Sequence, residues 1–264
     1  MKPRDLIRLA VATLGLASLA SQAAPSLPDQ ERYLRLQAAP ITLYPEAELA
    51  QSGLPGIFNA HARADDAIVV SYVDALKVPT RLASLGIERG DIWVYIPREM
   101  DLTQNGRQNL QGAKGILYVP SPGRGQALSA AEARRVSESA AILGCRMIVG
   151  LEPDLTRNRH NIAEISRDAA VLTIYDHKRL QRGAAEYRKY VERLTQEARV
   201  VNPAIKIEVC IATGGNAEAT KAAAGVLWAC ADLVDRIGIY CNDTAESRAS
   251  LGKLYEVLRG APPA

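Results

Sequence analysis

From residue 67 onward, short apolar runs alternate with longer amphipathic segments, and this alternation limits the fold more than any other feature of the chain. The runs are apolar at consecutive positions, as is typical of parallel strands buried on both faces. The expected strands are Ala67–Val73, Ile92–Ile96, Gly115–Val119, Arg146–Leu151, Val171–Tyr175, Ile205–Ile211 and Arg236–Tyr240. The expected helices are Pro79–Leu85, Ser129–Leu143, Asn161–Asp168, Ala184–Val200, Ala217–Cys230 and Glu246–Leu258.

Strands that alternate with helices form βαβ units and therefore a parallel sheet. Seven or eight such units predict an α/β protein of the (β/α)8 TIM-barrel type, or a trimmed variant, with parallel strands inside and helices outside. A doubly wound open sheet is the alternative. It is less favoured because no Gly-x-Gly-x-x-Gly sequence follows the first strand, so a dinucleotide site is not indicated.

The first 23 residues have the composition of a secretory signal peptide. Three basic residues precede an apolar run from Leu9 to Ala20, and Ser21-Gln22-Ala23 supplies small residues at the cleavage positions. We expect cleavage after Ala23 and a secreted or periplasmic protein. The apolar run is shorter than the ~20 residues that span a bilayer, which disfavours the alternative of an N-terminal membrane anchor. No stable membrane insertion is expected after removal of the signal.

The rest of the chain divides into three parts. Residues 24–66 contain five prolines before residue 56 and little periodicity, so we expect an extended lead-in with one short strand at Ile41–Tyr44. Residues 67–260 form the expected barrel domain. Residues 261–264 form a short tail that we expect to fray.

Charge and cysteine content exclude several function classes. A formal net charge of +3 is too small to indicate a nucleic-acid partner. The spacing of the four cysteines matches no zinc pattern, and we expect neither a metal nor a cofactor. Buried free thiols are the favoured state of Cys145, Cys210, Cys230 and Cys241, with a disulfide between Cys210 and Cys241 as the alternative for an exported protein.

Half of the ten tyrosines stand at the ends of expected strands, each followed closely by a polar, charged or proline residue. In a barrel these ends converge on the face that carries the active site. The pattern therefore predicts a polar, tyrosine-lined pocket, although tyrosine also favours strands for reasons unrelated to function. The expected substrate-binding residues are Tyr72, Asp74, Tyr95, Tyr118, Tyr175, His177, Tyr240 and Asn242.

Carboxyl groups also follow several expected strands, and hydrolysis of a glycosidic bond usually requires two of them. Glu152 is the strongest candidate for the general acid, because it directly follows an apolar strand where desolvation would raise its pKa. Asp176 and Glu99 are the candidate partner carboxylates. Each of these acids, taken singly, also fits the ordinary roles of a loop residue, a helix cap or an ion-pair partner.

Three stretches together resemble secreted, glycoside-hydrolase-like TIM-barrel proteins. They are Val94–Glu99 with Gln104–Gln111, Gly150–Leu155, and the run from Tyr187 through Asn202-Pro203 to Tyr240. The resemblance implies a barrel and a polysaccharide-related function. The chain departs from one large hydrolase clan in having Leu151, not Asn, before its strand-end acid. It also lacks the alternating aspartates of chitinase-like proteins, and aromatic residues make up only 5% of it.

The sequence thus predicts an exported glycoside-hydrolase-like barrel that acts on a glycan or small polar ligand by carboxylate acid/base chemistry. The alternative is a non-catalytic barrel that binds a glycan or another envelope component. Two acids about 5–10 Å apart across an open cleft would favour the enzyme. Acids held in ion pairs with arginine or lysine would favour the binding protein.

Overall fold

The computed structural model describes residues 29–46, 49, 52–71, 85–96, 110, 112–120, 130–151, 159–213 and 217–259. The expected signal peptide (1–23), the C-terminal tail (261–264) and nearly all of the expected helix Pro79–Leu85 lie outside these residues. Within the described part of the chain, no helix has both the length and the apolar character needed to cross a membrane.

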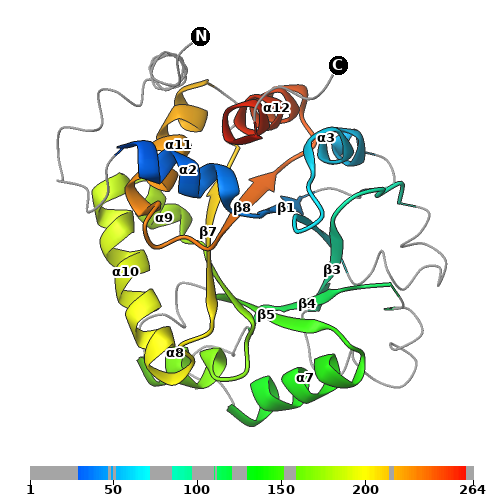
Figure 1. Cartoon of the computed structure of the whole chain (residues 1–264), viewed down its shortest axis with the longest axis vertical. Helices are drawn as coiled ribbons and strands as arrows, with labels where there is room; N and C mark the ends of the chain where they lie inside the picture. The colour runs from blue at the N-terminus through cyan, green and yellow to red at the C-terminus, as the bar shows by residue number, and fades with distance from the viewer. Residues whose placement is uncertain are drawn as a thin grey trace.

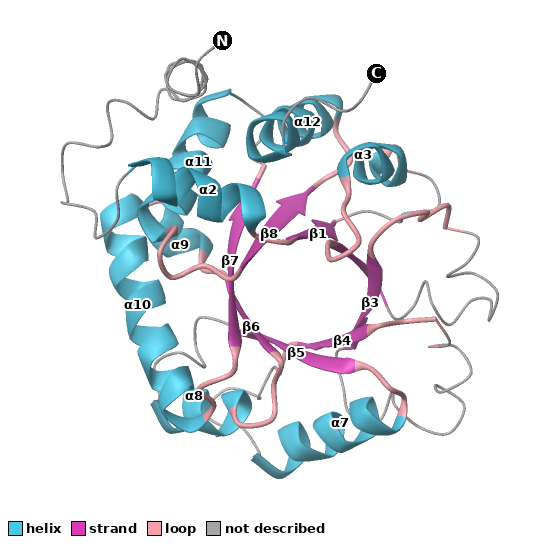
Figure 2. Cartoon of the chain, in the orientation of Figure 1, coloured by secondary structure: helices cyan, strands magenta, loops and turns pink. Residues whose placement is uncertain are grey.

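Eight parallel strands close into a barrel in chain order, so that β1 pairs with both β2 and β8 (Figures 1 and 2). They are β1 (Ile41–Pro45), β2 (Ala67–Ser71), β3 (Asp91–Ile96), β4 (Gly115–Tyr118), β5 (Arg146–Leu151), β6 (Val171–Ile174), β7 (Lys206–Ala212) and β8 (Arg236–Cys241). The prediction of a (β/α)8 barrel is confirmed.

Helices surround the barrel (Figure 2). They are α2 (Asp29–Ala38), α3 (Leu54–His61), α7 (Ala130–Ile142), α8 (Arg159–Ser166), α9 (His177–Leu180), α10 (Ala184–Val201), α11 (Ala217–Cys230) and α12 (Ala245–Arg259). The longest of these, α10, shows how they attach. Its Tyr187, Tyr190, Val191, Leu194 and Ala198 recur every three or four residues and are buried, so they form the stripe that packs on the barrel.

The strand expected at Ile41–Tyr44 is present as β1, but the described residues around it do not form the extended lead-in that was expected for residues 24–66. The strand β1 is part of the barrel and closes it between β2 and β8, and the helices α2 and α3 flank it. The prolines are compatible with regular structure because of where they stand. Pro40 precedes β1, and Pro55 lies in the first turn of α3, where no amide donor is needed. The barrel domain therefore begins at β1 and not at residue 67.

A buried ion pair fastens the last helix to the first strand. Asp66 Oδ1 accepts hydrogen bonds from the Ile41 amide at 2.5 Å and from Arg259 Nη2 at 2.9 Å. Its Oδ2 accepts from the Arg63 amide at 2.8 Å. The two charged side chains are at most 4% exposed. This contact closes the outer layer at the seam where the first and last elements of the barrel meet.

All four cysteines are buried free thiols. Cys210 packs inside the barrel, whereas the Cys241 thiol lies 3.5 Å from the Ser247 hydroxyl of α12, on the outer face of the sheet. The two sulfur atoms thus lie on opposite faces of neighbouring strands, which excludes the disulfide considered above. Burial raises the pKa of Cys230 to about 12, so this thiol stays protonated at neutral pH.

Candidate ligand-binding site at the barrel mouth

One buried carboxylate organises the barrel interior. Glu208 of β7 is fully buried and accepts hydrogen bonds from the hydroxyls of Thr42, Tyr44 and Thr173, the last at 3.0 Å. Arg236 of β8 donates through Nε to the same carboxylate at 3.4 Å. Four strands therefore contribute to one network, in which Oε2 has two partners and Oε1 has three, the third being the Cys210 thiol at 3.9 Å.

Three tyrosine rings stack above this network at the carboxyl ends of the strands. We call Tyr44 of β1, Tyr240 of β8 and Tyr175, which directly follows β6, the tyrosine cluster. The Tyr240 ring lies between the other two, with its centroid 4.6 Å from that of Tyr44 and 4.5 Å from that of Tyr175. Such stacked arrangements are favourable beyond simple burial. The cluster is anchored below, because the Tyr44 hydroxyl donates to Glu208.

Small residues make the stacking possible. Tyr240 of β8 and Tyr175, which follows β6, are separated by β7, whose Cys210 belongs to the inner core at this level. On β8, Gly238 supplies the remaining space. A Cβ atom at Gly238 would stand 3.0 Å from Cε2 of Tyr44 and would overlap the Cys210 sulfur. The absence of a side chain at Gly238 is therefore what allows Tyr44 to reach Glu208.

The phenols of the cluster stay protonated at neutral pH. Burial first, and then the nearby Glu208 carboxylate, raise the pKa of Tyr44 well above its usual value. Burial followed by the Glu46 carboxylate raises the pKa of Tyr175, and burial likewise raises that of Tyr240. Tyr44 is buried with its hydroxyl on Glu208, and Tyr240 lies between the other two rings. The half-buried Tyr175 is therefore the ring of the cluster that can meet a ligand.

Glu46 is an acid at the mouth that the sequence prediction missed. Its amide donates to the Cys241 carbonyl at 2.9 Å, which extends the β1–β8 ladder one residue beyond Pro45. Side chains alternate along a strand, so Glu46 shares the inward face of β1 with Thr42 and Tyr44. It is exposed, and no side chain among the described residues forms an ion pair with it.

The structure brings part of the predicted pocket together. Tyr175 and Tyr240 belong to the tyrosine cluster, and the half-buried Tyr95 of β3 packs against the same inner core. Tyr118 does not lie with them, which corrects the prediction for this residue. It is buried on the outer face of β4, where its hydroxyl donates to Glu132 of α7 at 2.6 Å.

Asp176, which the sequence offered either as a catalytic partner carboxylate or as a helix cap, is a helix cap in the structure. It follows Tyr175 and therefore turns away from the barrel interior. Its carboxylate caps α9 by accepting from the Arg179 amide at 3.1 Å, and it also pairs with the Arg179 side chain at 3.3 Å. The carboxylate is buried and fully used, which argues against its proposed part as a catalytic partner.

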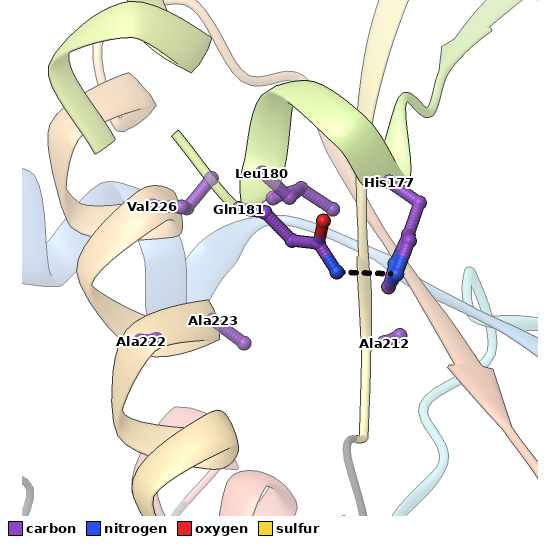
Figure 3. Close-up of a pocket in the computed structure, with 7 residues that line it drawn as sticks. All are labelled: His177, Leu180, Gln181, Ala212, Ala222, Ala223 and Val226. Carbon is purple, nitrogen blue, oxygen red and sulfur yellow. Dashed lines mark hydrogen bonds between the residues drawn. The ribbon is translucent and has the colours of Figure 1, made fainter. Parts of the chain in front are cut away.

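His177 lines a separate cavity of about 170 Å³ beside the mouth (Figure 3). Its Nε2 lies 2.9 Å from the amide nitrogen of Gln181. Leu180 and the small residues Ala212, Ala222, Ala223 and Val226 complete the wall, which is mostly apolar. These residues belong to β7, α9, α11 and the turn after α9, and no residue of the tyrosine cluster lines this cavity. Asn242 is exposed after β8, where its Oδ1 accepts from the Thr244 hydroxyl at 3.2 Å.

The remaining predicted residues, Glu152, Glu99, Tyr72 and Asp74, lie outside the described residues. Among the residues that are described, no three His, Cys, Asp or Glu side chains are arranged to hold a metal ion. Two signals in the sequence would have found the missed residues. Tyr44 followed by Glu46 repeats the strand-end tyrosine pattern, and Glu208 is an acid inside an otherwise apolar strand.

Comparison with known proteins supports the fold. No protein-family model matches the sequence, and no curated protein matches it either. Among solved structures, deoxyribose phosphate aldolase from Aeropyrum pernix aligns with a TM-score of 0.50 and 15% identity over 97% of this chain and 99% of that chain. The carboxyl transferase domain of Rhizobium etli pyruvate carboxylase aligns with a TM-score of 0.52 and 10% identity over 89% of this chain and 51% of that chain.

The present chain thus spans about half the length of that second structure. At such low identities the likeness shows a shared (β/α)8-barrel fold and does not transfer an activity. Fold and site together define a TIM-barrel protein with an aromatic, polar mouth.

The close packing of Tyr44 and Cys210 against Gly238 can be tested directly by substitution. We expect Gly238→Ala to lower the free energy of unfolding by about 1–3 kcal/mol, because the added methyl group overpacks Tyr44 and Cys210. Gly252→Ala on α12, where a Cβ meets nothing within 4 Å, should instead be neutral or stabilise by about 0.5–1 kcal/mol. Urea denaturation measures both. Equal stability of the two variants would contradict the described packing, and Cys210→Ala should partly restore Gly238→Ala.

Proposed function

We propose that the protein is an exported (β/α)8 barrel that binds a carbohydrate at its mouth. The observation that carries this proposal is the tyrosine cluster, in which Tyr44 and Tyr240 are stacked and Tyr175 packs tilted against Tyr240. The cluster lies at the end of the barrel where ligands bind in proteins of this fold. A sugar has apolar ring faces that stack on aromatic rings and hydroxyls that need polar partners. Tyrosine rings beside the Glu46 carboxylate offer both.

The ion pairs formed by the described acids Asp176, Asp243 and Glu208 favour a binding function over a catalytic one. Asp176 is held by Arg179, Asp243 by Arg248 at 2.6 Å, and Glu208 by Arg236. Carboxylate oxygens in such pairs are already engaged by a guanidinium group and are less available to a substrate. A binding protein is therefore the function that the described geometry supports best.

Tyr175 is the residue of the cluster whose substitution tests carbohydrate binding. We expect Tyr175→Ala to weaken binding of an oligosaccharide by about tenfold, or 1.4 kcal/mol, because the ligand loses its stacking surface. Tyr175→Phe keeps the ring and should bind within a few-fold of the unmodified protein. Isothermal titration against cello-, xylo- and chito-oligosaccharides measures this. Tyr33→Ala on α2, a half-buried tyrosine away from the mouth, is the matched control. Unchanged binding by Tyr175→Ala would contradict the proposal.

A second candidate function is glycoside hydrolysis, favoured by the carboxylate of Glu46 at the mouth. Glu152 would be the general acid, since it directly follows β5 in the chain. We expect Glu152→Gln to reduce glycan turnover by about a hundredfold or more. Asp176→Asn should retain turnover, because Asp176 caps a helix. Absence of turnover by the unmodified protein on glycans that it binds would leave binding as the function.

Export is the remaining part of the proposal, and the support for it is the N-terminal sequence. Three basic residues, an apolar run and small residues at 21–23 fit a cleaved signal. Expression of the full chain in a Gram-negative host should release a protein whose first residue is Ala24. Mass spectrometry of the periplasmic fraction measures its N-terminus. Recovery of the uncleaved chain from the cytoplasm alone would contradict export.

A further inference from the structure

The mouth carries a carboxylate, Glu46, that no described side chain neutralises through an ion pair. Glu46 shares the inward face of β1 with Tyr44, and its backbone is fixed by the hydrogen bond to the Cys241 carbonyl. The side chain is exposed at the rim. This hydrogen bond places the backbone of Glu46 at the rim, next to the end of β8 that carries Tyr240.

The described cations on the neighbouring elements are engaged elsewhere. Arg179 pairs with Asp176 and Glu186, and its guanidinium lies 4.5 Å above the Tyr190 ring of α10. Arg248 donates to Asp243, and Arg236 is buried beneath the cluster with Glu208. Lys178 is exposed on α9, and no ion pair joins it to Glu46. Within the described residues, the charge of Glu46 is thus left for a ligand.

The field of this carboxylate reaches the rings. Burial is the largest cause of the raised pKa of Tyr175 and of Tyr240, and the Glu46 carboxylate is the second cause at Tyr175 and the smallest contribution at Tyr240. Glu208 acts in the same direction on Tyr44 and Tyr240. Aromatic faces attract cations through their quadrupole, and a carboxylate beside the ring adds a direct charge. A cation would be stabilised by both groups, whereas an anion would be repelled by both.

We propose that the mouth selects a carbohydrate that carries a protonated amine, such as a glycan of de-N-acetylated amino sugars. The amine would pair with Glu46 while the sugar ring stacks on Tyr175. This inference rests on the proposed carbohydrate binding and adds the charge of the ligand to it. A neutral sugar could also donate hydroxyls to Glu46, but it would gain neither the ion pair nor the attraction of the ring faces.

Two trisaccharides that differ only in this group provide the test. Tri-glucosamine carries free amines and tri-N-acetylglucosamine has the same rings and linkages without the charge. We expect the purified protein to bind tri-glucosamine roughly five- to tenfold more tightly at low salt. Glu46→Gln should reduce this preference to about onefold by weakening only the amine ligand. Glu88→Gln, which removes an exposed glutamate at the opposite end of the barrel, should leave the preference unchanged.

The outcomes separate this inference from the function on which it rests. Equal binding of the two trisaccharides, or a preference that survives Glu46→Gln, overturns the amine selection but leaves carbohydrate binding in place. Binding of neither trisaccharide, together with no binding in the wider panel, overturns both. If Tyr175→Ala loses binding of both trisaccharides and Glu46→Gln loses only the preference between them, carbohydrate binding and amine selection are both supported.

Discussion

The Glu208 carboxylate is the interaction on which the inside of the barrel depends. A carboxylate without exposure to water is tolerated only when it is paired and its oxygens accept hydrogen bonds, and removing one partner of a buried pair typically costs about 3–5 kcal/mol. Here the partners come from β1, β6 and β8, so the charge fixes three strands relative to β7. Arg236 is covered in turn, with its guanidinium 4.7 Å from the centre of the Trp93 ring.

This network determines how the tyrosine rings are oriented at the mouth of the barrel. Because Tyr44 must reach down to Glu208, its ring stands upright in the barrel and offers a face to Tyr240. The small residues on β7 and β8 then allow Tyr175 to complete the stack. Aromatic rings that are held by one another and by a buried charge have little conformational freedom left, so the proposed ligand-binding surface is organised in advance.

The sequence predicted the later two-thirds of the fold well because each helix there has a clear apolar stripe and each strand a clear apolar run. The strand β1 was assigned to a lead-in because it is short and lies among prolines, and only pairing with β8, far along the chain, makes it part of the barrel. The site was harder to predict. Strands that are apolar on both faces do not reveal which residues point inward, and so Tyr118 was grouped with Tyr175 although it faces α7.

Glu46 and Glu208 show how position in one barrel separates two roles of the same chemical group. Glu208 lies within the closed interior, where the low dielectric requires an arginine and three hydroxyls to hold its charge. Glu46 lies at the rim, where water stabilises its charge, and it can remain without an internal partner. The first can stabilise but has no free oxygen for a ligand. The second contributes little to stability, and it is the carboxylate that the proposed selection of an amine-bearing ligand would use.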